Sequence, residues 1–208
     1  MTLLTAIFVL SILLLVYVYA GYPVVARLLG RGAPQRVEAA VPGAYQPTVT
    51  VLIAAFNEAK SIEATVRNKL SQDYPADKLN VIVVSDESED GTDDLVRGIG
   101  DPRVRLIRQQ PRAGKTAALN LAMPEATGEI IVFSDANSLY AADTVANLVL
   151  PLADPDVGYV TGRMVYKAPD GSLTGEGCSA YMKYENKLRE WETDLGSIVG
   201  VDGGVDAM

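Results

Sequence analysis

Two strand patterns flank one helix pattern in the stretch Val49–Thr92, which reads VTVLIAAFNEAKSIEATVRNKLSQDYPADKLNVIVVSDESEDGT. The runs Val49–Ala54 and Leu79–Val84 are short, apolar and β-branched, as buried strands are. Between them, apolar residues recur at helical spacing over Glu58–Gln72. This order predicts two parallel strands joined by a crossover helix.

The same alternation of patterns continues beyond this stretch. Further strands are predicted over Val104–Ile107, Ile130–Phe133 and Val157–Thr161, and further helices over Asp93–Ile99, Lys115–Met123, Ala142–Leu152 and Tyr181–Leu195. The segment Ile198–Met208 reads as a glycine-rich loop followed by the start of a strand or a helix. The sequence therefore predicts an α/β fold, a mainly parallel sheet with helices on both faces, in which ligands bind at the carboxyl ends of the strands.

The N-terminus carries a long apolar run. No charged side chain occurs from residue 2 to residue 26, and Leu3–Ala20 reads LLTAIFVLSILLLVYVYA. As a helix this run is about 27 Å long, close to the hydrocarbon thickness of a bilayer. A cleaved signal peptide is the alternative, but no Lys or Arg precedes the run and it is long for such a peptide. Because Arg27, Arg31 and Arg36 follow it, we expect a single transmembrane helix with the rest of the chain in the cytoplasm.

The pattern predicts three parts: a transmembrane anchor over 1–26, a juxtamembrane linker rich in Gly, Pro and Ala over 27–47, and an α/β domain over 48–208. A net charge of -8 without a Lys/Arg cluster argues against a nucleic-acid partner. The absence of histidine excludes a Ser-His-Asp triad and a histidine zinc site within this sequence, and a single cysteine excludes an internal disulfide framework.

Polar residues follow four of the predicted strands or open the next helix, in the segments Ala55–Glu58, Ser85–Thr92, Arg112–Lys115 and Ser134–Asn137. Each has a structural interpretation when taken singly. Glu58 suits the start of a helix, Asp90 a helix cap, Lys115 a solvated surface and Asp135 a turn. Together, however, they place several acidic groups and a lysine on one rim of one sheet, which indicates a binding site.

The residue types on this rim suit a nucleoside diphosphate. Asp86 can accept hydrogen bonds from a base or a ribose. Asp135 and Asn137 offer two hard oxygen ligands to a divalent cation, Mg²⁺ or Mn²⁺. Lys115 follows Gly114 at a helix start, where free backbone N–H groups also meet phosphate. A cation and a lysine on a diphosphate make it a better leaving group.

Several segments resemble, in order, the motifs of family 2 glycosyltransferases. Ala54–Glu58 resembles the strand end Pro-x-Tyr-Asn-Glu, and Ser85–Thr92 resembles Asp-Asp-x-Ser-x-Asp-Gly-Thr. Gly114–Asn120 resembles Gly-Lys-x-x-Ala-Leu-Asn, and Asp135-Ala136-Asn137 stands where the family has Asp-x-Asp. Gly200–Gly204, with Ala207, resembles the Gly-x-x-Gly loop near the acceptor site. The resemblance runs from Val49 to the last residue.

This resemblance implies a GT-A fold and inverting transfer from a nucleotide sugar, commonly a UDP-sugar, to a polysaccharide, glycolipid or other acceptor. In a bacterial-type cell the enzyme would lie in the cytoplasmic membrane with its catalytic domain, 48–208, inside. By resemblance the nucleotide-sugar residues are Phe56, Glu58 (ribose), Asp86 (base), Lys115 (phosphates) and Asp135, the metal ligands are Asp135 and Asn137, and the acceptor-side loop holds Gly200, Gly203 and Gly204.

The sequence departs from the family pattern in three ways. Ala54 replaces Pro, and Asn137 replaces the second metal-binding Asp. The family's catalytic base, in a Thr-Glu-Asp-like motif, and its Gln-x-x-Arg-Trp motif are expected beyond Met208, so we expect this chain to bind donor and metal but to transfer sugar negligibly. A nucleotide-sugar-binding module without catalysis is the alternative. An oxidoreductase is disfavoured because no Gly-x-Gly-x-x-Gly follows the first strand.

Overall fold

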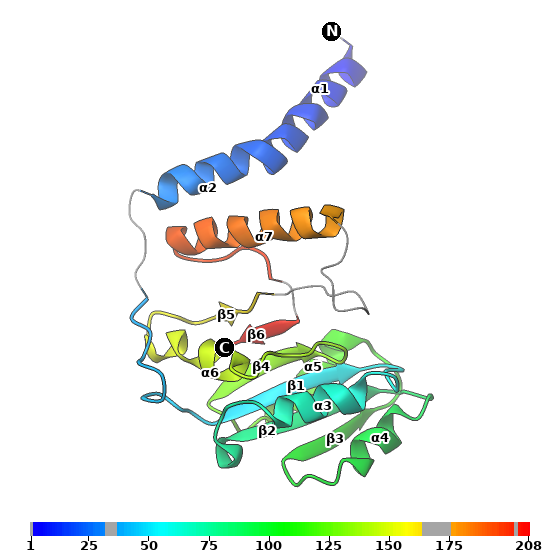
Figure 1. Ribbon diagram of the computed structural model, residues 1–208. Coiled ribbons are helices and arrows are strands. Elements are labelled where there is room, and N and C mark those ends of the chain that lie inside the picture. Colours follow the sequence, from blue (N-terminus) through cyan, green and yellow to red (C-terminus); the bar gives the residue numbers. More distant parts are fainter. Residues whose placement is uncertain (1, 32–36, 164–175, 202–203) are drawn as a thin grey trace. The chain divides into compact units, whose positions relative to one another are not determined.

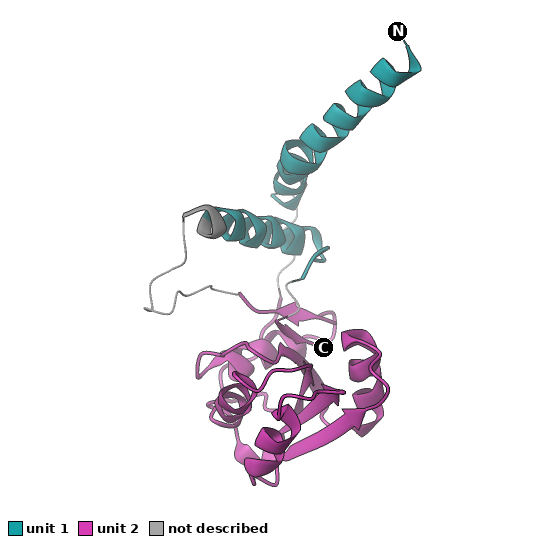
Figure 2. Cartoon of the chain, turned by 90° about the vertical axis from the view of Figure 1, so that its right-hand side faces the viewer, with its two compact units in different colours: residues 1–36, 165–201 teal, residues 37–164, 202–208 magenta. Residues whose placement is uncertain are grey.

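A computed structural model describes residues 2–31, 37–163, 176–201 and 204–208, with side chains from residue 180 onward in the third range. The chain forms two compact units, shown in different colours in Figure 2. Unit 1 comprises residues 1–36 and 165–201, and unit 2 comprises residues 37–164 and 202–208. Unit 2 holds the α/β fold that the sequence predicts.

Unit 2 is built on a six-stranded sheet with the strand order β3-β2-β1-β4-β6-β5 (Figure 1). Its strands are β1 (Val49–Ala55), β2 (Leu79–Asp86), β3 (Val104–Gln109), β4 (Ile130–Asp135), β5 (Val160–Thr161) and β6 (Val205–Ala207). The strands β1 to β4 pair in parallel, and β6 is antiparallel to both of its neighbours. The predicted α/β class with a mainly parallel sheet is confirmed, and the segment after Ile198 ends in a strand.

Helices cover both faces of this sheet, because β1 is apolar on both of its faces. Val51 and Ile53 share one buried cluster with residues of α3 (Ile62–Leu70), α4 (Thr92–Gly98) and α6 (Thr144–Val149). Leu52 shares the opposite cluster with residues of α5 (Lys115–Ala122). Short 3₁₀ turns complete the unit at Ala76–Lys78, Met123–Glu125 and Pro151–Ala153. A strand buried on both faces is typical of a parallel sheet between helix layers.

Two predicted helices are several residues shorter in the structure, and α5 ends one residue early, at Ala122. The helix predicted from Glu58 begins at Ile62, because the backbone N–H groups just after β1 bond to the loop that follows β2. The helix predicted over Ala142–Leu152 is α6, only Thr144–Val149, followed by the turn that Pro151 begins. Proline lacks the N–H that would continue an α-helix.

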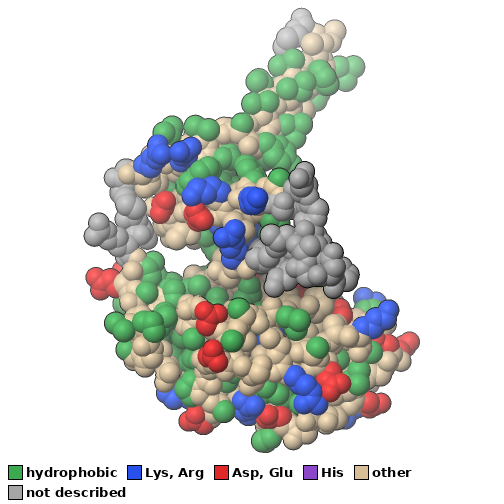
Figure 3. Space-filling model, in the orientation of Figure 1, with side chains coloured by type: hydrophobic (Ala, Val, Ile, Leu, Met, Phe, Trp, Pro, Cys, Tyr) green, Lys and Arg blue, Asp and Glu red, His purple; other side chains and the backbone are tan. Residues whose placement is uncertain are grey.

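Unit 1 contains the apolar N-terminal helix. It comprises α1 (Leu3–Val16), a π-helical turn (Tyr17–Gly21) and α2 (Tyr22–Gly30), and it runs beyond Ala20, where the apolar run ends. These 28 residues are about 42 Å long, enough to cross a bilayer. On the face seen in Figure 3, many exposed hydrophobic side chains lie along this helix. A signal sequence near an N-terminus passes the same test of length and composition.

A second helix of unit 1, α7 (Glu176–Leu195), contacts α2. The Tyr22 hydroxyl donates to Glu192 Oε1 at 2.6 Å. The Arg27 guanidinium lies 5.5 Å from the ring centre of Trp191. The predicted linker 27–47 therefore begins inside a helix, while its later part lies on unit 2, where the Ala40 N–H donates to the Leu150 carbonyl. The part boundaries at 26 and 47 stay predictions.

Candidate functional site

The register of the parallel strands brings the predicted site residues to one edge of the sheet. Asp86, the last residue of β2, pairs with Gln109, the last residue of β3. Asp135, the last residue of β4, pairs with Ala54 near the end of β1. Since β1 lies between β2 and β4, the two aspartates stand on either side of one strand end. This edge is where ligands bind in open parallel sheets.

The loops that follow β1 and β2 are tied together by hydrogen bonds. The Asn57 N–H donates to Ser88 Oγ at 3.1 Å, and the Glu58 N–H donates to Thr92 Oγ1 at 2.9 Å. Asn57 has φ = 54°, in the left-handed region that asparagine tolerates better than most residues. Ser88 and Thr92 of the signature segment therefore shape the rim through contacts within the protein.

Asp90 belongs to the same set of contacts. Its Oδ1 accepts from the N–H and the hydroxyl of Thr92, the first residue of α4, and its Oδ2 accepts from the Ala59 N–H at 2.9 Å. The Thr92 hydroxyl bond and these N–H groups lower the pKa of Asp90 below its ordinary value. The N-cap of α4 is Gly91, without a side-chain cap bond, so the capping interpretation of Asp90 is wrong; Asp90 precedes the N-cap and links the start of α4 to the Ala59 N–H.

Asp86 is almost completely buried, with 3% of its surface exposed. Its Oδ1 accepts from Gln109 Nε2 and the Ala113 N–H, and its Oδ2 accepts from the Gly114 N–H at 2.8 Å. Arg112 Nε lies 3.8 Å from Oδ2. Burial alone raises the pKa of Asp86, but the N–H groups of Ala113 and Gly114, then Gln109 and Arg112, together bring it below its ordinary value. Asp86 is therefore an ionised anchor for the turn that precedes α5.

An aromatic ring and a guanidinium stack beside this turn. The Arg112 guanidinium carbon lies 3.5 Å from the ring centre of Phe56, and 37% of Phe56 is exposed. The Arg112 N–H donates to Glu87 Oε2 at 2.8 Å, which fixes the backbone of the turn. Glu58 Oε2 accepts from the Ser61 hydroxyl at 2.7 Å. Phe56 thus offers a ring face, and Glu58 a half-buried carboxylate, on the same rim.

Lys115 and Asp135 form an ion pair, with Lys115 Nζ 2.6 Å from Asp135 Oδ1. Their side chains are 51% and 34% exposed, and Asn137, two residues further on, is exposed. The Asp135 carboxylate thus already faces one positive charge, that of the Lys115 ammonium group. Carboxylate and amide oxygens are ligands that Mg²⁺ and Mn²⁺ accept. Among the described residues no group of three His, Cys, Asp or Glu could hold a metal, so a cation here needs oxygens from a ligand.

The predicted acceptor-side glycines are only partly placed. In unit 1, the Gly200 carbonyl accepts from Arg189 Nε at 3.1 Å. In unit 2, the buried Gly204 carbonyl accepts from the Tyr140 hydroxyl at 3.4 Å. Gly203 lies outside the described residues.

Two neighbouring residues of α3, Asn68 and Lys69, contact the site but were not predicted from the sequence. Both bond to the segment after Asp135, and Lys69 is completely buried. A signal for Lys69 was present. It lies three residues after Val66 and seven after Ile62, so it falls on the buried face of the helix, where an unpaired lysine is unexpected.

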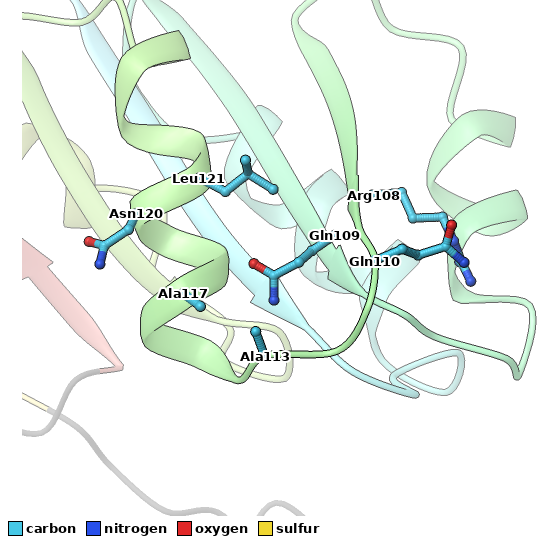
Figure 4. A pocket seen from close by; sticks show the side chains of 7 residues that line it. All are labelled: Arg108, Gln109, Gln110, Ala113, Ala117, Asn120 and Leu121. Atoms are coloured by element: carbon cyan, nitrogen blue, oxygen red, sulfur yellow. The ribbon is translucent and has the colours of Figure 1, made fainter.

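A hollow of about 660 Å³ lies between β3 and α5 (Figure 4). Its lining residues are Arg108, Gln109, Gln110, Ala113, Ala117, Asn120 and Leu121. It adjoins the turn that Asp86 anchors, but Asp86, Lys115 and Asp135 are not among its lining residues. A second hollow of about 300 Å³ lies along the start of α4, lined by Asp93, Arg97 and Arg108 among others. Lys115 and Asp135 lie on the exposed rim outside this lining, whereas Asp86 is buried.

Comparisons with known proteins bear on the family and the fold of the chain. Residues 50–201 match the model of Glycosyl transferase family 2. The chain is 35% identical over 129 residues to an N-acetylglucosaminyltransferase of Bradyrhizobium elkanii, covering 59% of this chain and 69% of that protein. It is 29% identical over 156 residues to a beta-monoglucosyldiacylglycerol synthase of Trichormus variabilis, covering 73% of this chain and 33% of that protein.

Among solved structures, the chain resembles mannosyltransferase PcManGT from Pyrobaculum calidifontis, determined with GDP-Man and Mn²⁺. The TM-score is 0.74 at 35% identity, over 94% of this chain and 54% of that one. The Staphylococcus aureus TarS structure, with a TM-score of 0.53 at 21% identity, supports the fold alone. The chain belongs to glycosyltransferase family 2 and has the GT-A fold. It spans about half of the mannosyltransferase and a third of the lipid synthase.

Proposed function

We propose that this protein transfers a sugar from a nucleoside-diphosphate sugar, a UDP-sugar, to a polysaccharide or glycolipid acceptor, with Mg²⁺ or Mn²⁺ as cofactor. The observation that carries the proposal is the arrangement at one sheet edge. The turn that opens α5 is anchored by Asp86, and its Lys115 reaches Asp135 at 2.6 Å. A helix start and a lysine beside a carboxylate suit a diphosphate and its cation.

The nucleoside would lie between Phe56 and Asp86. A carboxylate can accept about four hydrogen bonds, and Asp86 already accepts three within the protein. One position therefore remains for an N–H of the base. The base would stack on the Phe56 ring, a face that Arg112 covers in this structure. Such stacking contributes about 1–3 kcal/mol per base. Glu58 would accept from the ribose.

The diphosphate would lie beside Lys115 and the first N–H groups of α5. Asp135 and Asn137 would hold the divalent cation, which neutralises charge on the departing diphosphate. Lys115 would then exchange its bond to Asp135 for one to a phosphate oxygen, while Asp86 keeps the turn in place. Gly200, Gly203 and Gly204 would lie on the acceptor side.

We also propose that Leu3–Ala20, within the N-terminal helix, spans a bacterial-type cytoplasmic membrane, with unit 2 on the cytoplasmic side. Its length, its apolar surface and the basic residues that follow the first 26 support this orientation. Protease added to intact spheroplasts should spare unit 2. Digestion from outside, or a mature N-terminus near Gly21, would contradict the proposal.

Calorimetry with a panel of UDP-sugars and GDP-mannose, each with and without Mn²⁺, tests donor binding. We expect a UDP-sugar to bind, and to bind more tightly with Mn²⁺. A preference for GDP-mannose would correct the base, and no binding of any member would refute the function.

A nucleotide-sugar-binding module without catalysis is the second candidate. Asn137, standing where the family has an aspartate, favours it, because a neutral amide is a weaker ligand for a hard cation. Transfer of radiolabelled sugar to membrane acceptors by the full-length protein, with any residues that follow Met208, separates the two, since a binding module would bind donor and leave the acceptors unlabelled.

A further inference from the structure

Lys69 is a completely buried lysine that lies beneath the segment carrying the proposed metal ligands. Its exposed fraction is 0%, and its Nζ donates to the Ser138 carbonyl at 2.5 Å and to Asn68 Oδ1 at 3.3 Å. The same nitrogen lies 3.4 Å from the ring centre of Tyr140. Lysine side chains are almost never completely buried, so a lysine at this position calls for a role beyond packing.

Asn68, the preceding residue of α3, holds the backbone of the same segment at two points. Its Nδ2 donates to the Tyr140 carbonyl at 2.9 Å, and its Oδ1 accepts from the Tyr140 N–H at 2.7 Å. Together Asn68 and Lys69, which we name the α3 clamp, satisfy three backbone groups of the segment 138–140. Paired contacts of this kind fix both the position and the direction of a chain segment.

Tyr140 extends the clamp toward the last strand of unit 2. Its hydroxyl lies 3.2 Å from the Phe133 carbonyl and 3.4 Å from the Gly204 carbonyl, so one donor faces both. Tyr140 is itself buried, with 8% exposed. The segment 135–140, which we name the β4 loop, is thus held at its far end by α3 and by Tyr140, while Asp135 and Asn137 at its near end face solvent.

We propose that the α3 clamp is a positioning device for the β4 loop, and that Lys69 and Asn68 hold Asp135 and Asn137 in the arrangement that binds a divalent cation together with a nucleoside diphosphate. The inference rests on the proposed function. Neither clamp residue would touch the cation or the nucleotide. Their effect would pass through the backbone from Ser138 and Tyr140 to Asn137 and Asp135.

The two proposed oxygen ligands stand on parts of the backbone that differ in rigidity. Asp135 is fixed as the last residue of β4, whereas Asn137 lies in the loop beyond the strand. Divalent ions such as Mg²⁺ demand near-ideal ligand geometry. A site whose loop adopts several conformations therefore binds the cation more weakly. The clamp removes that freedom before the ligand arrives, which lowers the entropy lost on binding.

Lys69→Met tests the clamp, because methionine keeps much of the side-chain volume and removes the charge and both hydrogen bonds. The probe is UDP, titrated into the full chain with and without Mn²⁺. We expect the factor by which Mn²⁺ tightens UDP binding to fall about fivefold or more, as for the loss of one or two hydrogen bonds. The affinity measured without Mn²⁺ should change little. Lys78→Met is the matched control, since Lys78 Nζ also donates to a backbone carbonyl, that of Gln46 at 2.7 Å, at an exposed position.

Asn68→Ala provides a second and milder variant should Lys69→Met fail to fold. It removes both bonds to the Tyr140 backbone, and we expect the same loss of the Mn²⁺ effect, about threefold. An unchanged Mn²⁺ effect in both folded variants, or an equal loss of affinity with and without Mn²⁺, would overturn the clamp while leaving the proposed function in place. If the wild-type chain binds no UDP, with or without Mn²⁺, the proposed function fails and the clamp fails with it.

Discussion

Asp86 and Asp135 end parallel strands on either side of β1, yet their surroundings differ sharply. Asp86 is buried, and three protein donors already bond to its carboxylate. Asp135 is about one-third exposed and pairs with the ammonium of Lys115. The position of a carboxylate at a sheet edge therefore does not define its role. A carboxylate supplied with N–H groups by its own chain shapes the site, whereas one that faces solvent can bind a cation.

The difference arises from the segments that follow each strand. The turn 112–114 folds back onto β2, and its backbone N–H groups point at Asp86. No comparable turn covers Asp135 among the described residues of unit 2, and its loop is instead held from α3. The turn anchored on Asp86 positions Lys115 at the start of α5. The contacts from α3 position the proposed metal ligands Asp135 and Asn137.

The largest effect is expected for Asp86→Ala. The N–H groups of Ala113 and Gly114 and the buried Gln109 side chain would lose their acceptor, and a hydrogen bond to a charged group contributes about 1.5–3 kcal/mol. We expect the free energy of unfolding to fall by about 2–4 kcal/mol and UDP affinity to fall at least about tenfold. Denaturant unfolding and calorimetry measure the two quantities. Asp94→Ala, at an exposed position of α4, is the control. An equal loss of stability in both variants would contradict the structural role given to Asp86.

Asp135→Ala should separate binding from stability. The ion pair with Lys115 is exposed, and such pairs contribute about 0–1 kcal/mol. We expect the unfolding free energy to change by less than about 1 kcal/mol, while UDP affinity in the presence of Mn²⁺ falls about tenfold. Denaturant unfolding and calorimetry again measure the two quantities. A large loss of stability with intact Mn²⁺ dependence would reverse the roles given to the two aspartates.

The buried lysine behind the β4 loop predicts a pH dependence of stability. Burial lowers the pKa of Lys69 to about 7 from its ordinary value of 10.5, although the nearby Asp135 opposes the shift. Tyr140, the other titratable group against it, has its pKa raised, mainly by burial. Between pH 7 and 10.5 the unfolded chain then binds more protons, so stability relative to Lys69→Met should rise with pH in this window. Unfolding followed by circular dichroism across the window checks this, and parallel curves for the two proteins would contradict it.

The smallest effect is expected for Asn137→Asp. A second carboxylate adds charge to a hard-cation site, so Mn²⁺ should bind several-fold more tightly in the presence of UDP, by about 1 kcal/mol or less. Calorimetric titration of Mn²⁺ at saturating UDP measures it. Asn147→Asp on α6 is the control, and an equal gain there would point to net charge rather than to a ligand.

Sequence patterns alone predicted the alternation of strands and helices and the edge at which the polar residues meet, because strand ends and parallel pairing follow from local hydrophobic runs. They also predicted that Lys115 and Asp135 share one rim. The three hydrogen bonds that Asp86 accepts were not predictable, since two of the donors are the N–H groups of Ala113 and Gly114, 27 and 28 residues later. Nor was the late start of α3, which depends on bonds from Glu58 to the loop after β2.

Electron paramagnetic resonance of Mn²⁺ tests most directly whether Asp135 and Asn137 bind a divalent cation together with a nucleoside diphosphate. Free Mn²⁺ is titrated into the chain alone, into the chain with UDP, and into Asp135→Ala with UDP. Because the two residues offer one formal charge between them, we predict weak binding alone, tight binding with UDP, and loss of that gain in the variant. Tight Mn²⁺ binding without nucleotide, or an undiminished gain in Asp135→Ala, would contradict the account.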